Sequence, residues 1–209
     1  RWHSEESDSY RLFHGSAEGF PGLSIDRKGP LIIVQTWKAP LEPGELAMLC
    51  ETCCQVLETD LVPCWNHLSP PVDLVRWHRP EFPEVRVSHE LGIRYELHPR
   101  WRSGRALFEL ELRPARRWLS QHSEASSVLS LFARGCSLGI SATAGGAAEI
   151  WHVDRDPLAL HWGKKSAQLN PAGRRPVRWL QSECTPVLRQ LAGLNMQLRG
   201  ERQADFLPL

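Results

Sequence analysis

The sequence predicts an α/β protein in which an α+β domain precedes the first half of a Rossmann-like domain. Three observations favour this fold class. The apolar run at residues 128–132 has the length of a strand buried on both faces of a parallel sheet. A small-residue turn at 135–139 follows it, and a second strand-like run at 149–153 ends at Asp154. The order strand, turn, helix, strand, acid is typical of a nucleoside-binding Rossmann-like unit.

Composition and turn signals divide the chain into three parts. Residues 1–9 are polar and without periodicity, so they are predicted to be a frayed lead-in. Residues 10–99 are predicted to form an α+β middle domain with the order strand, strand, helix, strand, strand. Residues 100–209 are predicted to hold the Rossmann-like part.

The elements of the middle domain follow from local patterns. A first hairpin is expected within residues 10–37, where turns at 19–22 and 27–30 bracket a short strand at 23–25 and a β-branched run follows at 31–35. A helix is expected at 45–58 after the break near Pro40. A short strand at 61–65 and an alternating hairpin at 85–97 complete the domain.

Length and charge exclude several classes of protein. With 209 residues and 42% hydrophobic side chains, the chain can bury a real core. The net charge of +1 indicates no partner by itself, so a nucleic-acid signal must come from local charge. No apolar run has the length of a membrane span, and no signal peptide is visible. A cytoplasmic protein without a membrane partner is expected.

The six cysteines predict neither a metal site nor a disulfide framework. Cys50, Cys53 and Cys54 share the apolar face of the predicted helix at 45–58, so packing explains them. A lone C-x-x-C without a second pair is weak support for zinc. Reduced thiols are expected in a cytosolic protein.

Asp154 is the residue that indicates a nucleoside cofactor. At the carboxyl tip of its strand it could accept hydrogen bonds from both hydroxyls of a ribose. It lies about 20 residues past the turn, as in dinucleotide sites, but the G-x-G-x-x-G pattern for a pyrophosphate is absent. S-adenosylmethionine, which has no pyrophosphate, fits better. An α/β unit that binds nothing remains the alternative.

Three strings resemble one enzyme family. Residues 131–170 are similar to motifs I and II of the bacterial class I methyltransferases that make 5-methylcytosine in large-subunit ribosomal RNA. Residues 11–27 resemble a segment of their middle domain, and residues 103–119 resemble the segment before motif I. The resemblance implies a class I methyltransferase domain, S-adenosylmethionine as cofactor and RNA as substrate.

The resemblance also implies a set of cofactor-binding residues. Glu183 follows the strand expected at 177–180, where the family has an acid that accepts from the adenine amino group; a surface acid on a loop is the alternative. The implied set comprises Phe132, Ala133, Arg134, Gly135, Cys136, Asp154, Arg155 and Glu183.

Two arginine-rich stretches are candidate RNA contacts. Residues 94–117 hold seven arginines against three glutamates, and residues 174–202 hold six against two, so both would attract phosphates. For the first stretch, the alternative is a solvated helix face on which Glu109 and Glu111 are neutralised by Arg113 and Arg105.

The expected catalytic residues of the family are missing. Three strands make an incomplete class I methyltransferase sheet, and none of the six cysteines matches the position of the family's attacking thiolate, which C5 chemistry needs. No catalytic residue is therefore predicted, and the chain is expected to be truncated at both ends.

Two other functions remain open. A catalytically degenerate RNA- or nucleotide-binding module of the same fold is favoured by Leu107, Glu109 and Arg134, which depart from the family's pattern. A nucleotide-dependent oxidoreductase is disfavoured by the missing G-x-G-x-x-G.

Overall fold

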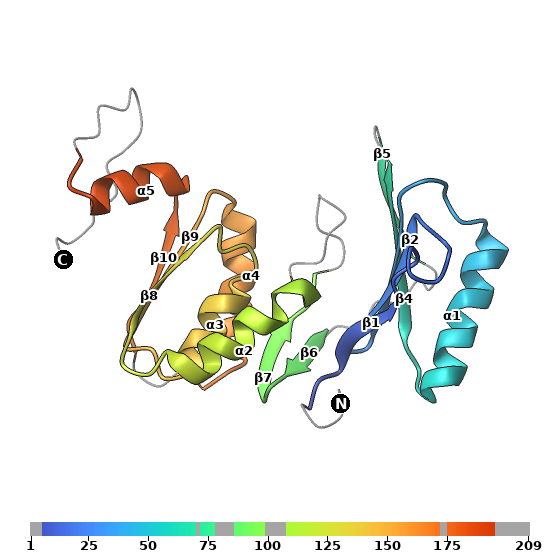
Figure 1. Ribbon diagram of the computed structural model, residues 1–209, viewed down its shortest axis with the longest axis horizontal. Helices are drawn as coiled ribbons and strands as arrows, with labels where there is room; N and C mark the ends of the chain where they lie inside the picture. Colours follow the sequence, from blue (N-terminus) through green and yellow to red (C-terminus); the bar gives the residue numbers. More distant parts are fainter. Residues whose placement is uncertain (1–5, 70–71, 78–85, 99–107, 172–174, 195–209) are drawn as a thin grey trace.

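The computed structural model describes residues 6–69, 72–77, 86–98, 108–171 and 175–194. Figure 1 shows a five-stranded sheet with one helix, a three-stranded sheet with several helices, and a hairpin between them. This is the mixed α/β architecture that the sequence predicts.

The N-terminal sheet has its five strands in sequence order. They are β1 (Ser9–Phe13), β2 (Leu23–Lys28), β3 (Leu31–Thr36), β4 (Val62–Ser69) and β5 (Val72–Trp77). Helix α1 (Pro43–Leu57) connects β3 to β4, which pair in parallel, whereas the other neighbours are antiparallel. The helix lies on the outer face of the sheet (Figure 1).

This sheet corrects the predicted order of elements. Three strands precede the helix and four follow it, whereas the predicted order has two on each side. The strands expected at 23–25, 31–35, 61–65 and in the 85–97 hairpin leave out β1 and β5. Strand β1 escapes the periodicity argument because it is an edge strand of mostly polar residues, in which Arg11 pairs with Asp26 of β2 at 2.7 Å. The lead-in also ends earlier than predicted, since Ser7 and Ser9 are buried.

The apolar face of α1 packs on the sheet as the sequence predicts. Leu46 and Cys50 are buried against β3 and β4, with Cys53 and Cys54 partly buried beside them. Burial raises the pKa of the Cys50 thiol to about 12, so the group stays protonated. None of the chain's six cysteines forms a disulfide bond.

The hairpin of β6 (Val87–Glu90) and β7 (Ile93–Glu96) joins the two units. Its inward side chains Ile93 and Tyr95 share one hydrophobic cluster with Ile33 of β3 and with Ile140 and Leu160 from the Rossmann-like part. One core therefore includes residues from both sides of the boundary predicted at residue 99.

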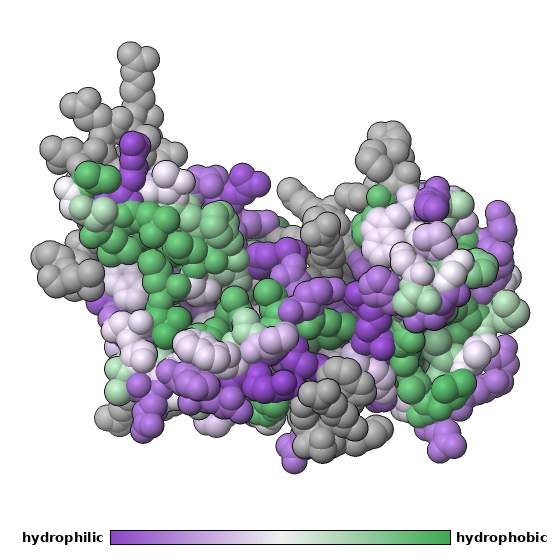
Figure 2. All heavy atoms as spheres, in the orientation of Figure 1, coloured by the Kyte–Doolittle hydropathy of each residue, from purple (hydrophilic) through white to green (hydrophobic). Residues whose placement is uncertain are grey.

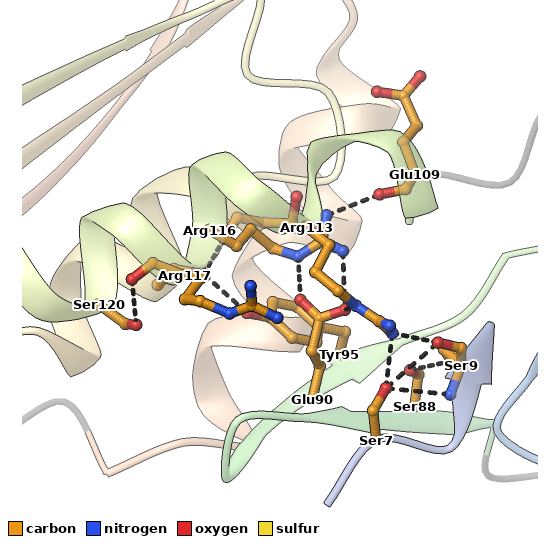
Figure 3. A network of polar contacts seen from close by, with 12 residues as sticks. Ser7, Ser9, Ser88, Glu90, Tyr95, Glu109, Arg113, Arg116, Arg117 and Ser120 are labelled. Carbon is orange, nitrogen blue, oxygen red and sulfur yellow. Dashed lines mark hydrogen bonds and ion pairs between the residues drawn. The ribbon is translucent and has the colours of Figure 1, made fainter. Parts of the chain in front are cut away.

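A buried carboxylate ties the hairpin to the next helix (Figure 3). Glu90 accepts from Nε of Arg113 at 2.7 Å and from Nε of Arg116 at 2.6 Å. Arg113 also donates to Ser7 Oγ and to the carbonyl of Ser9, which brings strand β1 into the network. Burial alone would raise the pKa of Glu90, but the hydrogen bonds and charges of the two guanidinium groups lower it overall.

This network corrects part of the predicted RNA contact. Arg113 and Arg116 are buried and bound to Glu90, so these two members of the 94–117 stretch cannot reach a phosphate backbone. Three other members of the stretch, Arg100, Arg102 and Arg105, lie outside the described residues.

The Rossmann-like part alternates helices and strands. Its elements are η2 (Leu110–Leu112), α2 (Arg113–His122), β8 (Ser127–Leu131), α3 (Ser137–Ala144), β9 (Glu149–Asp154), α4 (Pro157–Gln168), β10 (Val177–Gln181) and α5 (Cys184–Leu191). The three strands pair in parallel in the order β10-β9-β8. Helix α4 begins with Asp156 as its N-cap and Pro157 in the first turn.

The two faces of this sheet are covered unequally. Helices α2, α3 and α4 lie on the face toward the hairpin (Figure 1). On the other face, α5 packs on Val153 through Cys184 and Val187, while Leu129 of β8 is 37% exposed. The prediction that residues 128–132 form a strand buried on both faces is wrong for this chain: among the described residues, no strand pairs with the outer edge of β8, and Leu129 is partly exposed.

Candidate functional site

The carboxyl ends of three parallel strands meet at one edge of the Rossmann-like sheet. The turn at 132–136 follows β8, Asp154 ends β9 and Glu183 follows β10. Main-chain hydrogen bonds connect the three segments: Ala133 N–H donates to the Val153 carbonyl at 2.9 Å, and Ser182 N–H to the Asp154 carbonyl at 3.0 Å. Open α/β sheets bind their ligands at this edge.

The carboxylate of Asp154 points into the turn. Its Oδ2 accepts from the backbone N–H of Arg134 at 2.7 Å, and its Oδ1 accepts from the N–H of Asp156 at 2.9 Å. The residue is 8% exposed. Since a carboxylate offers about four acceptor sites, two backbone bonds fix its orientation and leave capacity for hydroxyl donors.

The turn itself has an unusual backbone. Phe132, Arg134 and Cys136 have φ angles of 51°, 47° and 61°, in the left-handed region that favours glycine. Such conformations cost roughly 1–3 kcal/mol each and cluster at ligand sites. The Phe132 side chain is 72% exposed beside this edge, whereas Gly135 and Cys136 are buried.

Cys136 is a packing group in the structure. It precedes α3, and burial raises the pKa of its thiol. A Cβ atom on Gly163 of α4 would lie 2.3 Å from the Cys136 sulfur, so α4 approaches the turn this closely only because residue 163 is glycine.

Arg155 and Glu183 face each other across the ends of β9 and β10. Arg155 Nη1 lies 3.6 Å from Glu183 Oε1, and both side chains are largely exposed. Exposed ion pairs contribute little, with a median of about 0–1 kcal/mol, so this pair can exchange for other partners. Glu183 is also the N-cap residue of α5, but its side chain makes no capping hydrogen bond.

Glu109 forms an ion pair with Arg134 of the turn. Glu109, which departs from the family's pattern, thus has a charged partner in the structure. Glu111 pairs with Arg11 of β1 at 3.0 Å. The predicted neutralisation of these glutamates by Arg113 is therefore wrong, because Arg113 binds Glu90. Arg105 and Leu107 lie outside the described residues.

His152 lies beneath the site and was missed by the sequence analysis. It is buried two residues before Asp154, stacks on Trp179 with ring centroids 4.3 Å apart, and its Nδ1 has no hydrogen-bond partner among the described residues. Burial lowers its pKa to about 4, so the imidazole is neutral. A Cβ on Gly139 would lie 2.2 Å from its ring, which explains the small residue opposite.

The second arginine-rich stretch is only partly described. Arg178 pairs with Glu149 at 3.0 Å, Arg175 donates to the Thr143 carbonyl, and Arg189 is exposed. Residues 174, 199 and 202 lie outside the described ranges. RNA contact through 174–202 stays a prediction.

In the part of the chain that the structure describes, no group of three His, Cys, Asp or Glu side chains could hold a metal ion. None of the described helices has the length and apolar character needed to cross a membrane.

The family follows from a comparison with known proteins. Residues 10–195 match the family described as S-adenosylmethionine-dependent methyltransferase. The chain belongs to this methyltransferase family. Because the family's cofactor is S-adenosylmethionine, the alternative of a nucleotide-dependent oxidoreductase is wrong.

Relatives of this methyltransferase include ribosomal RNA enzymes. The ribosomal RNA large subunit methyltransferase I of Aeromonas salmonicida is 26% identical over 188 residues, which cover 87% of this chain and 47% of that protein. The chain therefore spans about half the length of the curated relatives it matches.

Solved structures share the fold. A putative S-adenosylmethionine-dependent methyltransferase from Streptococcus mutans superposes with a TM-score of 0.77 at 19% identity, over 91% of this chain and 50% of that one. A putative methyltransferase complexed with S-adenosylhomocysteine (SAH) gives a TM-score of 0.75 at 20% identity, over 92% of this chain and 50% of that one.

Proposed function

We propose that this chain is the cofactor-binding part of a methyltransferase that modifies cytosine C5 in large-subunit ribosomal RNA. The observation that carries the proposal is the Asp154 carboxylate, which backbone N–H groups of Arg134 and Asp156 hold at the carboxyl edge of the sheet. Its remaining acceptor sites suit the two hydroxyls of a ribose. S-adenosylmethionine would supply the methyl group.

The other predicted site residues fit this assignment. The turn from Phe132 to Cys136 would accommodate the cofactor beside Asp154, since its left-handed residues turn the backbone tightly at the strand end. Glu183 would accept from the adenine amino group after exchanging its partner Arg155. Both residues are exposed enough for that exchange.

The uncovered sheet face supports the proposal that the working enzyme is larger than this chain. Figure 2 shows apolar side chains gathered over the region of β8, β10 and α5, where Leu129 and Leu188 are exposed. A two-sided α/β sheet buries such a face under further helices. We propose that additional strands pair with β8 and that the helices connecting them cover Leu129.

The target and the partner come from the relatives. The relative named above is a ribosomal RNA methyltransferase, and we propose RNA as the substrate here, contacted by exposed arginines of the 94–117 and 174–202 stretches. A cytoplasmic location, where ribosomal RNA is found, belongs to the same proposal.

The 209-residue chain is expected not to methylate by itself. Methylation at C5 needs a thiolate that attacks C6. Cys136 is buried with a raised thiol pKa, and Cys184 is buried between α5 and the sheet, so neither can attack a base. Radiolabel transfer from S-adenosylmethionine to ribosomal RNA should remain at background. Transfer that persists in a Cys136→Ala, Cys184→Ala variant would show that the chain uses other chemistry.

Calorimetric titration tests the cofactor assignment directly. The chain should bind SAH and should not bind NAD. NAD contains a pyrophosphate, and the turn lacks the G-x-G-x-x-G motif that binds one. A catalytically degenerate module is the second candidate, favoured by the ion pairs of Arg134 and Arg155, which occupy the edge. A well-folded sample that binds no SAH would support that candidate and contradict ours.

A further inference from the structure

A cavity of about 230 Å³ lies on the helix-covered face of the Rossmann-like sheet. It is bordered by the turn of the β6–β7 hairpin, the second half of α3, the end of α4 and the first residue of β10. Figure 1 shows β7 beside these two helices. None of the residues assigned to the cofactor edge lines this cavity. It is therefore a separate space, near the amino ends of the strands.

The walls of the cavity are mostly apolar. Ile93 and Ile140 belong to the core cluster that joins the hairpin to α3, and Val177 packs against a neighbouring cluster. A cavity of about 150 Å³ lined by such side chains stays dry and binds benzene. The volume here is below the roughly 300 Å³ at which sites for drug-sized ligands begin. It suits one aromatic ring with a small substituent, and a nucleoside is too large for it.

One buried polar atom on this wall lacks a partner. His152 is 1% exposed and lines the cavity, and its Nδ1 has no hydrogen-bond partner among the described residues. The Thr143 hydroxyl, in contrast, donates to the Gly139 carbonyl at 3.0 Å. A buried polar atom without a partner is unfavourable, so a ligand that supplies the partner gains binding free energy.

The side chain of Asn170 is already occupied. Its Oδ1 accepts from the Arg94 N–H at 2.9 Å, and its Nδ2 donates to the carbonyls of Arg94 and Ser166. Among the described residues that line the cavity, none carries a charge. An ionic ligand would lose its hydration there without a counter-charge, so the ligand is neutral.

The His152 ring is held in one place. It stacks on Trp179, and a Cβ on Gly139 would lie 2.2 Å from its Cε1 and 2.9 Å from its Nδ1. Because burial lowers its pKa to about 4, the imidazole is neutral, and Nδ1 donates or accepts according to the tautomer. A hydroxyl group can do both, so it satisfies Nδ1 in either tautomer.

We propose that this cavity is a binding site for a small phenol-like ligand. The aromatic ring lies between Ile93 and Ile140, and the hydroxyl group makes a hydrogen bond with His152 Nδ1. The site goes beyond the methyltransferase function and does not depend on the proposed cofactor site.

Phenol and toluene test the proposal on the wild-type chain, because they have nearly the same shape and toluene lacks the hydroxyl group. Titration of backbone amide signals by NMR gives both affinities and locates the ligand. A ligand as small as phenol should bind at about millimolar concentration. The signals of Ile93, Thr143 and Val177 should move, and saturation with SAH should not displace phenol.

Substitution of His152 separates the hydrogen bond from the cavity. His152→Leu should lower the ratio of phenol affinity to toluene affinity about tenfold, because the hydroxyl group loses its partner. His152→Asn, which keeps a polar atom near the position of Nδ1, should restore part of this ratio. His98→Leu is the matched control, since His98 is also buried and stacked on a tryptophan, but outside the cavity, and the ratio should not change.

Ala167→Leu tests the cavity itself. A leucine at this position of α4 takes up part of the cavity volume, so the affinities for phenol and toluene should fall together.

Four outcomes would overturn the proposal. Phenol would fail to bind in a saturable way, or it would move the signals of Arg134 and Asp154 and be displaced by SAH. Toluene would bind while phenol does not, so that Nδ1 makes no bond to a ligand. The ratio of the two affinities would be the same in the wild type and in His152→Leu.

Discussion

Glu90 and Asp154 are both buried carboxylates that accept several N–H donors, yet they serve different ends. Glu90 is fully buried and accepts from two guanidinium groups on α2. Asp154 accepts from two backbone amides at a strand tip and keeps acceptor sites open. A carboxylate whose acceptor sites are used by arginines connects secondary-structure elements. One that only backbone N–H groups orient keeps acceptor sites for a ligand.

The largest expected effect is on stability, at Glu90. Glu90→Gln leaves two buried guanidinium groups without their counter-charge, and removing one partner of a buried ion pair costs about 3–5 kcal/mol. The free energy of unfolding from urea titration should fall accordingly.

Glu111→Gln is the matched control, since the Glu111 pair with Arg11 is exposed and its loss should cost under about 1 kcal/mol. Equal effects of the two substitutions would show that the Glu90 network does not join the hairpin to α2 energetically.

The second effect is a pH dependence of the free energy of unfolding that comes from His152. The folded pKa of His152 is about 4, below its ordinary value of 6.5, so the unfolded chain takes up the proton first. Its contribution to stability is complete above pH 6.5 and is lost as pH falls toward 4, by about 2 kcal/mol at pH 5.

Urea unfolding at pH 7 and pH 5 measures this loss, which His152→Asn should reduce. His98, whose pKa burial also lowers to about 4, should account for a further part of the loss and serves as an internal comparison. The Glu90 contribution falls in a separate window, because the lowered pKa of that carboxylate confines its loss to pH below about 4.5. A pH 7 to pH 5 difference untouched by His152→Asn would contradict the role given to that histidine.

The third effect is on binding, at Asp154. Asp154→Asn should weaken SAH binding at least about tenfold, because charge-assisted bonds to ribose hydroxyls are lost. Thermal stability should also fall modestly, because the amide nitrogen of Asn cannot accept from one of the two backbone N–H groups that the buried carboxylate binds. Calorimetric affinity equal to wild type would refute the role of Asp154.

The smallest effect compares Asp156, which caps α4, with the neighbouring Asp154. Asp156→Ala removes the N-cap of α4, whose side chain accepts from the Leu158 N–H at 3.0 Å, and should cost about 1 kcal/mol of stability. SAH affinity should be kept, because the Asp156 backbone N–H still donates to Asp154. A loss of affinity comparable to that of Asp154→Asn would mean that the two acids act as one unit.

The sequence predicted features that depend on neighbouring residues better than contacts between residues far apart in the chain. In residues 127–154 the two strands and Asp154 were predicted closely, since adjacent residues encode them, but α3 begins at Ser137, inside the stretch predicted to be a turn. The alternation that reveals half-buried strands failed for β1, a polar edge strand. The partners Glu90 with Arg113 and Glu109 with Arg134 lie 23 and 25 residues apart, and no periodicity reports which charges meet in the fold.

The contact between Cys136 and Gly163 has a consequence for how related sequences can vary. The two positions share one volume, in which a sulfur atom at 136 leaves no room for a methyl group at 163. In homologues, glycine at 136 should permit alanine at 163, whereas cysteine at 136 should occur only with glycine at 163. The pair should therefore covary, and an engineer who reshapes the turn must alter helix α4 at the same time.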